Sequence, residues 1–362
     1  MKKWFLLLLA GALVLSLAAC SENSSDSNDD KDKPKTTLLD TPYSKTEFLM
    51  GTEVTLKIYD KGKEEVLDKA FDRVEQMDKE ITVNDDGKDS EVDKINQEAG
   101  KQPVKVSDDV FYLVKKGLEY SENSGGSFDI TIGPLTNLWH IGFSDARKPS
   151  QEEIDAVLPL IDYHNVELDE DAQTVYLTKE GMELDLGGIA KGYITDEVNK
   201  IFAENDVTTG IIDLGGNIYV RGNSPKADNG KWTVGIQDPF SPRGEIIGTI
   251  PEKNRSIVTS GIYERYVEVD GVKYHHILNP KTGYPYDNDI AGVTIVSDKS
   301  IDGDGLSTAT FSKGIEGGMD YIEQFDGVEA IFVSKEKKVY VTSGLKDTFK
   351  LTNDDFEMAE MK

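Results

Sequence analysis

The sequence predicts an α+β fold made of mostly antiparallel sheets with packed helices. Its helices and strands do not alternate as βαβ units, so a doubly wound parallel sheet is not expected. Asp270-Gly271 lies between two predicted strands, 263–269 and 272–278, and this pattern is a strong signal for a β-hairpin. No break in composition follows Tyr43, which favours one large globular unit over residues 43–362.

The individual elements follow from local patterns. Apolar residues at helical spacing predict helices, one opened by Ser107 or Asp108 and another by a capping box of Ser150 and Glu153. The helices are expected over 63–80, from about 108 onward, over 151–160 and 189–204, from about 305 onward, and over 317–324. Alternating or short apolar runs predict further strands over 53–59, 166–168, 174–177, 182–186, 210–213, 218–221, 232–237, 246–250, 290–296, 328–333 and 338–341.

The composition excludes several classes of protein. The 362 residues carry 67 Asp and Glu against 40 Lys and Arg, and the resulting net charge of −27 would repel nucleic acid. With one cysteine, a disulfide framework, a zinc–thiolate cluster and an iron–sulfur site are ruled out. Four histidines leave little room for a histidine-rich metal site, whereas an oxygen-ligated cation fits the abundant carboxylates.

The first residues, 1–19, have the pattern of a signal peptide. Lys2 and Lys3 precede an apolar run over 4–17, shorter than the about 20 residues of a membrane span. Leu-Ala-Ala then precedes Cys20, which is typical of a lipoprotein lipidated at that cysteine; an ordinary secretory signal is the alternative. Residues 20–42, rich in Ser, Asn, Asp and Lys, are expected to form a flexible tether. We therefore expect the protein at the extracytoplasmic face of the cell membrane, anchored only through Cys20.

Three glycine-rich segments interrupt the strand and helix patterns. Segment 124–129 (Ser-Gly-Gly-Ser-Phe-Asp) would let the backbone approach a ligand, or would end a helix in a buried turn. Segment 185–188 (Asp-Leu-Gly-Gly) precedes a helix with Lys191 in its first turn, and exposed N–H groups with a lysine suit a phosphate. Segment 213–217 (Asp-Leu-Gly-Gly-Asn) resembles it, but a tight strand exit is the preferred interpretation there.

Two further segments carry titratable groups. His275 and His276 end a strand before a Pro/Gly turn, and neighbours on a strand point to opposite faces, so at most one faces a site. A helix starting near Gly305 would make Asp304 its N-cap and place Thr308 one turn further on. One carboxylate, one hydroxyl and a carbonyl from elsewhere would suit Mg²⁺, although a capped helix accounts for the same residues without metal.

Together these segments resemble the FAD:protein FMN transferases, the ApbE-like family. The resemblance spans about residues 50–344, and its blocks stand in the family's order. The matching blocks are Met-Gly-Thr from Met50, Gly-Gly-Ser-Phe-Asp-Ile-Thr-Ile-Gly-Pro-Leu from Gly125, Asp-Leu-Gly-Gly-Ile-Ala-Lys-Gly-Tyr from Asp185, His-His-Ile-Leu-Asn-Pro-Lys-Thr-Gly from His275, and Asp-Gly-Leu-Ser-Thr-Ala from Asp304.

The resemblance implies a T-fold-like α+β core and a Mg²⁺-dependent enzyme. Such an enzyme cuts the pyrophosphate of FAD, transfers FMN as a phosphoester to a Thr or Ser of a target protein, and releases AMP. His276 is the candidate base, with assistance from Asp304. The residues implied at the FAD site are Met50, Asn84, Ser127, Phe128, Asp129, Asp185, Lys191 and Leu278. The residues implied at the Mg²⁺ site are Gly188 (through its carbonyl), Asp304 and Thr308, with Ser307 adjacent.

The implied partners are FAD and acceptor flavoproteins with a motif of the type Asp-Gly-x-Ser/Thr-Gly/Ser-Ala-Thr/Ser. The sequence leaves two alternatives open: an FAD pyrophosphatase that releases FMN and AMP, and a non-catalytic FAD-binding lipoprotein. Segment 304–310 itself resembles the acceptor motif, which raises the hypothesis that Thr310 is flavinylated by the protein itself.

Overall fold

A computed structural model of the chain describes residues 37–83 and 89–361. The predicted signal peptide, Cys20 and most of the tether, and Asn84 of the predicted FAD site, lie outside the described residues. The helices are α1 (Glu65–Ile81), α2 (Glu91–Gln97), α3 (Asp108–Asn123), α4 (Gly133–Trp139), α5 (Gln151–Val157), α6 (Gly187–Glu204), α7 (Ser300–Phe311) and α8 (Gly314–Ile322). The strands are β1 (Leu38–Leu49), β2 (Thr52–Asp60), β3 (Val104–Lys105), β4 (Val166–Asp169), β5 (Thr174–Leu177), β6 (Gly210–Leu214), β7 (Asn217–Arg221), β8 (Trp232–Gln237), β9 (Ile246–Glu252), β10 (Arg255–Gly261), β11 (Tyr266–Val269), β12 (Val272–His275), β13 (Ile290–Ser297), β14 (Glu329–Ser334), β15 (Lys338–Val341), β16 (Lys350–Leu351) and β17 (Glu357–Met358).

A large mixed sheet organises residues 37–361. Among the described residues it has nine strands, in the order β1-β2-β6-β7-β10-β13-β14-β15-β17. Each neighbouring pair is antiparallel until β15 and β17, which are parallel. Smaller sheets form from β16-β9-β8, β3-β5-β4 and the β11–β12 hairpin. The predicted α+β fold with mostly antiparallel sheet is therefore confirmed.

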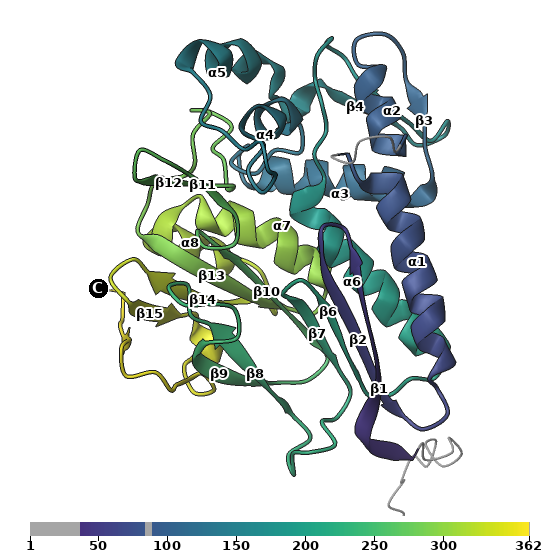
Figure 1. The fold of residues 1–362 in the computed structure, drawn as a ribbon, viewed down its shortest axis with the longest axis vertical. Coiled ribbons are helices and arrows are strands. Elements are labelled where there is room, and N and C mark those ends of the chain that lie inside the picture. Colours follow the sequence, from purple (N-terminus) through teal and green to yellow (C-terminus); the bar gives the residue numbers. More distant parts are fainter. Residues whose placement is uncertain (1–36, 84–88, 362) are drawn as a thin grey trace, which may run out of the picture. The chain divides into compact units, whose positions relative to one another are not determined.

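The large sheet is buried on both faces. Helices α1, α6 and α7 lie together along one face (Figure 1), and the β8–β9 sheet packs on the other. Alternation along the strands explains both layers. In β2, Val54, Leu56 and Ile58 belong to the core under the helices, whereas Tyr59 belongs to the core under β8 and β9. In the same way, Ala330 and Phe332 of β14 face the helices, and its neighbouring residues face the other side.

Several predicted boundaries differ from the structure. Strand β1 begins at Leu38, upstream of the predicted start of the folded part at Tyr43. No strand forms over 182–186, where an isolated bridge joins Glu183 to Ile132. The residues after Ile132, expected as a turn, form α4 with Pro134 near its start, a position that tolerates proline because no helical N–H is needed there. Helix α2, opened by a Ser90 capping box, was not predicted.

The predicted start of α7 is also wrong. The helix begins at Ser300, so Asp304 lies within it and is not its N-cap. Asp196 on α6 explains this start, because its carboxylate accepts the Ser300 N–H at 2.8 Å and the Ile301 N–H at 3.0 Å. A carboxylate from a distant helix thus satisfies the first N–H groups of α7, and local sequence carries no trace of that contact.

Within the described residues, no helix combines the length and apolar composition that a membrane crossing requires.

Candidate active site

The site is built where α6 and α7 cross. Gly192 of α6 lies so close to α7 that a Cβ there would be 2.4 Å from the Ser300 carbonyl oxygen. This close approach lets the Gly192 N–H donate to Asp304 Oδ2 at 2.6 Å. Asn217, the first residue of β7, donates to Asp304 Oδ1 at 2.9 Å. The side chain of Asp304 is therefore held between two helices and a strand, with 4% of the residue exposed.

Electrostatics at Asp304 are set by burial and by Lys191. Burial raises the pKa of Asp304, and the positive charge of Lys191 opposes that rise. Lys191 lies beyond the first turn of α6, because the helix begins at Gly187 and not at the predicted residue 189. Its ammonium makes no hydrogen bond or ion pair with another residue of 37–83 and 89–361. The structure thus combines a buried carboxylate with a cation that acts on it and whose ammonium has no partner among the described residues.

The other predicted metal ligands lie on the same two helices. Ser307 Oγ is engaged within the protein, 2.9 Å from the Asp304 carbonyl oxygen and 2.8 Å from Ser260 Oγ. The half-buried Thr308 hydroxyl has no hydrogen-bond partner among the described residues. Gly188 is the second residue of α6, and a Cβ there would lie 2.9 Å from the Phe128 ring. Thr308 is therefore better placed than Ser307 to offer its oxygen to a ligand.

The donor chemistry of this site fits Mg²⁺. Among the described residues, no cluster of three His, Cys, Asp or Glu side chains forms a metal site of its own. Asp304 offers a carboxylate whose two oxygens accept one hydrogen bond each from described residues, leaving lone pairs for a cation. One carboxylate, a hydroxyl and a carbonyl suit an ion that keeps several waters and binds phosphate, as Mg²⁺ does.

The two histidines lie in different surroundings. His275 is buried, and its Nε2 hydrogen-bonds the Tyr286 carbonyl at 2.9 Å. The half-buried His276 follows the end of β12, with its N and Nδ1 at 3.1 Å and 3.3 Å from the Arg265 carbonyl oxygen. Since a carbonyl only accepts, Nδ1 carries the proton and Nε2 keeps its lone pair.

The charge state of His276 suits a proton acceptor. Burial, followed by the charge of Arg265 and a smaller contribution from Lys191, lowers the pKa of His276 to about 3. The imidazole is therefore neutral at physiological pH, with Nε2 available. Lys191 is also the cation that acts on Asp304, so the charge of one lysine influences both the predicted base and the predicted metal ligand.

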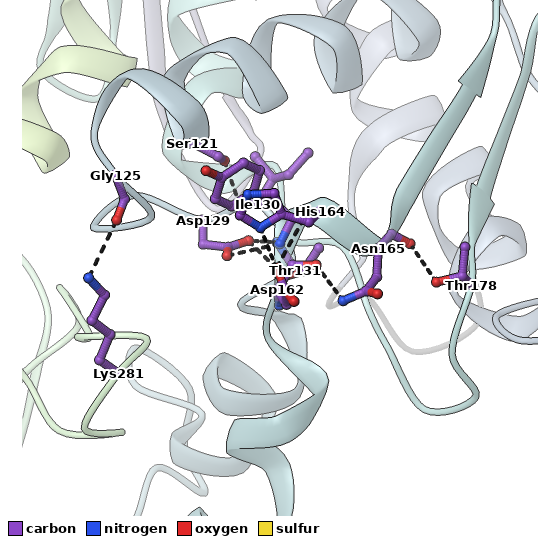
Figure 2. A network of polar contacts seen from close by, with 11 residues as sticks. Ser121, Gly125, Asp129, Ile130, Thr131, Asp162, His164, Asn165, Thr178 and Lys281 are labelled. Atoms are coloured by element: carbon purple, nitrogen blue, oxygen red, sulfur yellow. Dashed lines mark hydrogen bonds and ion pairs between the residues drawn. The ribbon is translucent and has the colours of Figure 1, made fainter.

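Figure 2 shows the loop that follows α3, which holds three predicted FAD residues. Asp129 Oδ1 accepts from the Thr131 N–H at 2.8 Å and from Thr131 Oγ1 at 2.7 Å, and Oδ2 accepts from the Tyr163 N–H at 3.2 Å. Thr131 Oγ1 accepts in turn from the Asp162 N–H at 2.9 Å. Burial raises the pKa of Asp129. Asp129 therefore ties its own loop to the segment around Asp162.

Ser127 and Phe128 are positioned by the same loop. The Tyr286 hydroxyl donates to the Ser127 carbonyl at 2.9 Å, which joins the loop to the segment after His276. The buried Phe128 ring meets Tyr120 edge-on, with ring centroids 6.3 Å apart, and borders Gly188. Phe128 is thus the contact between this loop and the start of α6.

The remaining predicted FAD residues lie around these elements. Asp185 Oδ1 accepts from the Gly187 N–H at 2.8 Å and so shapes the entry to α6. Met50 has a left-handed φ of 54° in the tight turn between β1 and β2. Leu278 packs into a separate apolar cluster with Leu135 and Trp139, and its backbone bridges Pro285. Leu278 can therefore meet a ligand mainly through its backbone.

Sequence reasoning missed Asn217. Segment 213–217 does form the predicted tight strand exit, with the Gly216 N–H donating to Asp213 Oδ1 at 2.9 Å and positive φ at Gly215 and Gly216. The same turn delivers Asn217 to Asp304. The likeness of this segment to 185–188 was the available signal.

The structure argues against self-modification at Thr310. This residue lies in α7 with no exposed surface, and its hydroxyl has no partner among the described residues. FAD cannot reach a hydroxyl that is enclosed in this way.

Comparisons with known proteins show the family to which the chain belongs. The family model described as the ApbE family matches residues 50–332. A Klebsiella pneumoniae (strain 342) protein named FAD:protein FMN transferase is 37% identical over 318 residues, covering 88% of this chain and 97% of its own length. A Treponema pallidum (strain Nichols) protein of the same name is 33% identical over 329 residues, covering 87% and 90%.

Solved structures give the same result. The crystal structure of the ApbE protein from Thermotoga maritima matches with a TM-score of 0.77 and 31% identity, covering 85% of this chain and 99% of that one. The apo flavinyl transferase ApbE from Pseudomonas stutzeri matches with a TM-score of 0.74 and 28% identity, covering 86% and 98%. With its motifs in order, its fold matched and its length covered, the chain belongs to the ApbE family.

Proposed function

We propose that this protein is an FAD:protein FMN transferase that requires Mg²⁺. The observation that carries the proposal is that Asp304, buried where α6 and α7 cross, and His276, neutral after the end of β12, both feel the charge of Lys191, which has no ion-pair partner among the described residues. Two relatives that are named for this activity align with this chain over 97% and 90% of their own length. A pure FAD carrier would not need a carboxylate with free lone pairs beside a base.

The residues divide the work of phosphoryl transfer. Nε2 of His276 accepts the proton of the acceptor hydroxyl, and the acceptor oxygen forms its bond to the FMN phosphorus. The bond from that phosphorus to the bridging oxygen breaks, and AMP leaves with the electron pair. Lys191 offsets the negative charge of the pyrophosphate throughout. Mg²⁺, when held by Asp304, Thr308 and the Gly188 carbonyl, would supply further neutralisation of phosphate charge.

The lipobox pattern supports a location for this activity. We infer that the signal peptide is removed and that Cys20 carries the lipid, so the enzyme acts at the extracytoplasmic face of the cell membrane. Its acceptors are then membrane-associated or secreted electron-transfer proteins. Residues 20–37 form the tether in this proposal. Mass spectrometry of the membrane-extracted protein tests it: an unmodified Cys20 would contradict the anchor.

The test of the activity uses the full chain in detergent with FAD, Mg²⁺ and a domain that bears the acceptor motif. Intact-mass spectrometry follows FMN addition to the acceptor, and chromatography follows AMP. Labelling that requires Mg²⁺ supports the transferase. Release of AMP and FMN without labelling of a competent acceptor would indicate a pyrophosphatase, and tight FAD binding without AMP release would indicate a carrier.

A further inference from the structure

We propose that Arg265 binds the pyrophosphate of FAD and stabilises the charge that develops when this group is cleaved. The inference rests on the proposed function. It adds a substrate-binding residue that is not among the predicted site residues. Arg265 lies in the turn before β11 and is exposed.

The Arg265 guanidinium lacks a partner among the described residues, unlike the guanidinium of each other arginine. Arg73 pairs with Asp109 and Glu197, and Arg147 pairs with Glu153. Arg221 and Arg255 donate to backbone carbonyls and to acceptor side chains, and Arg243 pairs with Glu264. In a chain with 67 acidic residues, an unpaired arginine is unexpected.

The neighbouring carboxylate is already occupied. Glu264 precedes Arg265 in the chain, but its Oε2 accepts from Arg243 Nη2 at 3.0 Å. Arg243 also donates to the Gly215 carbonyl, which ties Glu264 to the turn before Asn217. Arg243 thus neutralises the acid adjacent to Arg265 in the chain and leaves the positive charge of Arg265 available for a ligand.

The backbone around Arg265 is shaped to hold its side chain. Gly142 has a φ of 104°, and a Cβ at this position would lie 2.9 Å from Arg265 Cδ, so the glycine makes room for the aliphatic stem. A Cβ at Gly51 would lie 3.9 Å from Arg265 Nη2, which places the guanidinium beside the β1–β2 turn. The stem is therefore packed while the charged end remains beside Met50, a predicted FAD residue.

Arg265 also lies next to the predicted base. Its carbonyl oxygen accepts from His276, and its charge acts on the His276 ring together with that of Lys191. Two cations without carboxylate partners among the described residues therefore converge on the imidazole that would take the acceptor proton. A guanidinium presents paired donors that match phosphate oxygens, which a lysine ammonium does not.

The chemical step explains how the positive charge of Arg265 would act. When the acceptor oxygen bonds to the FMN phosphorus, the electron pair of the breaking bond passes to the phosphate of AMP. Negative charge then increases on the leaving phosphate while the proton moves to His276. A guanidinium hydrogen-bonded to the pyrophosphate stabilises that charge more strongly than it stabilises intact FAD.

The experiment compares Arg265→Met, which keeps the aliphatic stem against Gly142, with Arg265→Lys and with Arg147→Met. Arg147 pairs with Glu153 on the surface of α5 and serves as the matched control. The full-length variants are assayed for Mg²⁺-dependent AMP release from FAD. Their affinities for FAD and for riboflavin, which lacks phosphate, are measured in EDTA to prevent turnover.

We expect Arg265→Met to lower kcat/KM for FAD by about 10²-fold or more. FAD affinity should fall at least about tenfold more than riboflavin affinity, Arg265→Lys should recover only part of both losses, and Arg147→Met should match wild type. Unchanged FAD affinity and turnover in Arg265→Met, or equal losses for FAD and riboflavin, would overturn the inference. If the wild type releases no AMP, the proposed function fails, whereas the FAD-to-riboflavin comparison still decides whether Arg265 binds phosphate.

Discussion

Two buried aspartates, Asp129 in the loop after α3 and Asp304 in α7, are held in different ways. Asp129 accepts three hydrogen bonds from described residues, all from its own loop and the segment that the loop packs against. Asp304 accepts two, one from the Gly192 backbone on α6 and one from the Asn217 side chain on β7. Burial raises the pKa of both carboxyl groups, so burial alone does not distinguish them.

The difference lies in the remaining capacity of each carboxylate. An ionised carboxylate has about four lone-pair sites. Asp129 uses three of them to maintain the loop, whereas Asp304 keeps two beside Lys191 and Thr308. A buried carboxylate that spends most of its lone pairs on its own loop shapes the structure around it, and one that keeps half of them can bind a cation. We therefore interpret Asp304 as a ligand and Asp129 as a residue that positions its loop.

The largest expected effect tests this distinction directly. Asp304→Ala should lower Mg²⁺-dependent AMP release by about 10³-fold, because the proposed metal ligand is lost. FAD should still bind, since the residues predicted to contact FAD lie on other elements than α7. Asp320→Ala, an exposed acid on α8, is the control. Normal turnover in Asp304→Ala would show that the metal assignment is wrong.

A smaller effect concerns Asp196, which holds the start of α7. Burial raises its pKa to about 6 from an ordinary value of 3.8, so the folded state binds this proton more tightly than the unfolded state does. The free energy of unfolding should therefore fall as pH rises from about 4 to about 6, by at most about 3 kcal/mol from this group.

Urea denaturation across that pH range, in wild type and Asp196→Asn, isolates this contribution. The variant should lose the pH-dependent part while keeping an acceptor oxygen for one of the two α7 N–H groups. Parallel pH profiles for the two proteins would show that Asp196 does not titrate in this window.

Asn217→Ala should have an intermediate effect on activity. Removal of the amide leaves the Gly192 N–H as the remaining partner of the Asp304 carboxylate among the described residues, and loss of an orienting partner commonly costs 10–100-fold in metal affinity or activity. The Mg²⁺ concentration for half-maximal turnover should rise by about that factor. Asn229→Ala, in an exposed loop, provides the control. An unchanged Mg²⁺ requirement would mean that Asn217 only closes the β6–β7 turn.

Asp129→Asn should have the smallest effect on catalysis. The amide nitrogen would face the Tyr163 N–H, so one of the three hydrogen bonds is lost. We expect the free energy of unfolding to fall by about 1–2 kcal/mol and turnover to stay within about tenfold of wild type. Urea melts and AMP release measure the two. Complete loss of turnover in a stable Asp129→Asn protein would place Asp129 among the residues that touch substrate.

Local pattern predicted some elements well and others poorly. The spacing of apolar residues in β2, β13 and β14 identified these strands, because successive side chains of a strand point to opposite faces of the sheet. The Ser150 capping box identified the start of α5 for a similar reason. The starts of α6 and α7 were misplaced, since glycines at 187, 188, 303 and 305 are weak helix formers. These glycines instead allow close contacts with Phe128, Val258 and Tyr120.

By itself, the sequence determined the α+β class, six of the nine described strands of the large sheet (β2, β6, β7, β13, β14 and β15) and the motif blocks that resemble the ApbE family. Strands β1, β10 and β17 were not predicted. Periodicity, helix caps and motif order can be read from the sequence, because they do not depend on how distant elements pack. Only the tertiary structure decided which of the two aspartates keeps more free lone pairs, that Asn217 holds Asp304, and that Arg265 has no carboxylate partner among the described residues. Those outcomes depend on contacts across 112 residues, between Gly192 and Asp304, and across 87, between Asn217 and Asp304. No local pattern encodes a contact at such separations, because it forms only when distant elements pack together.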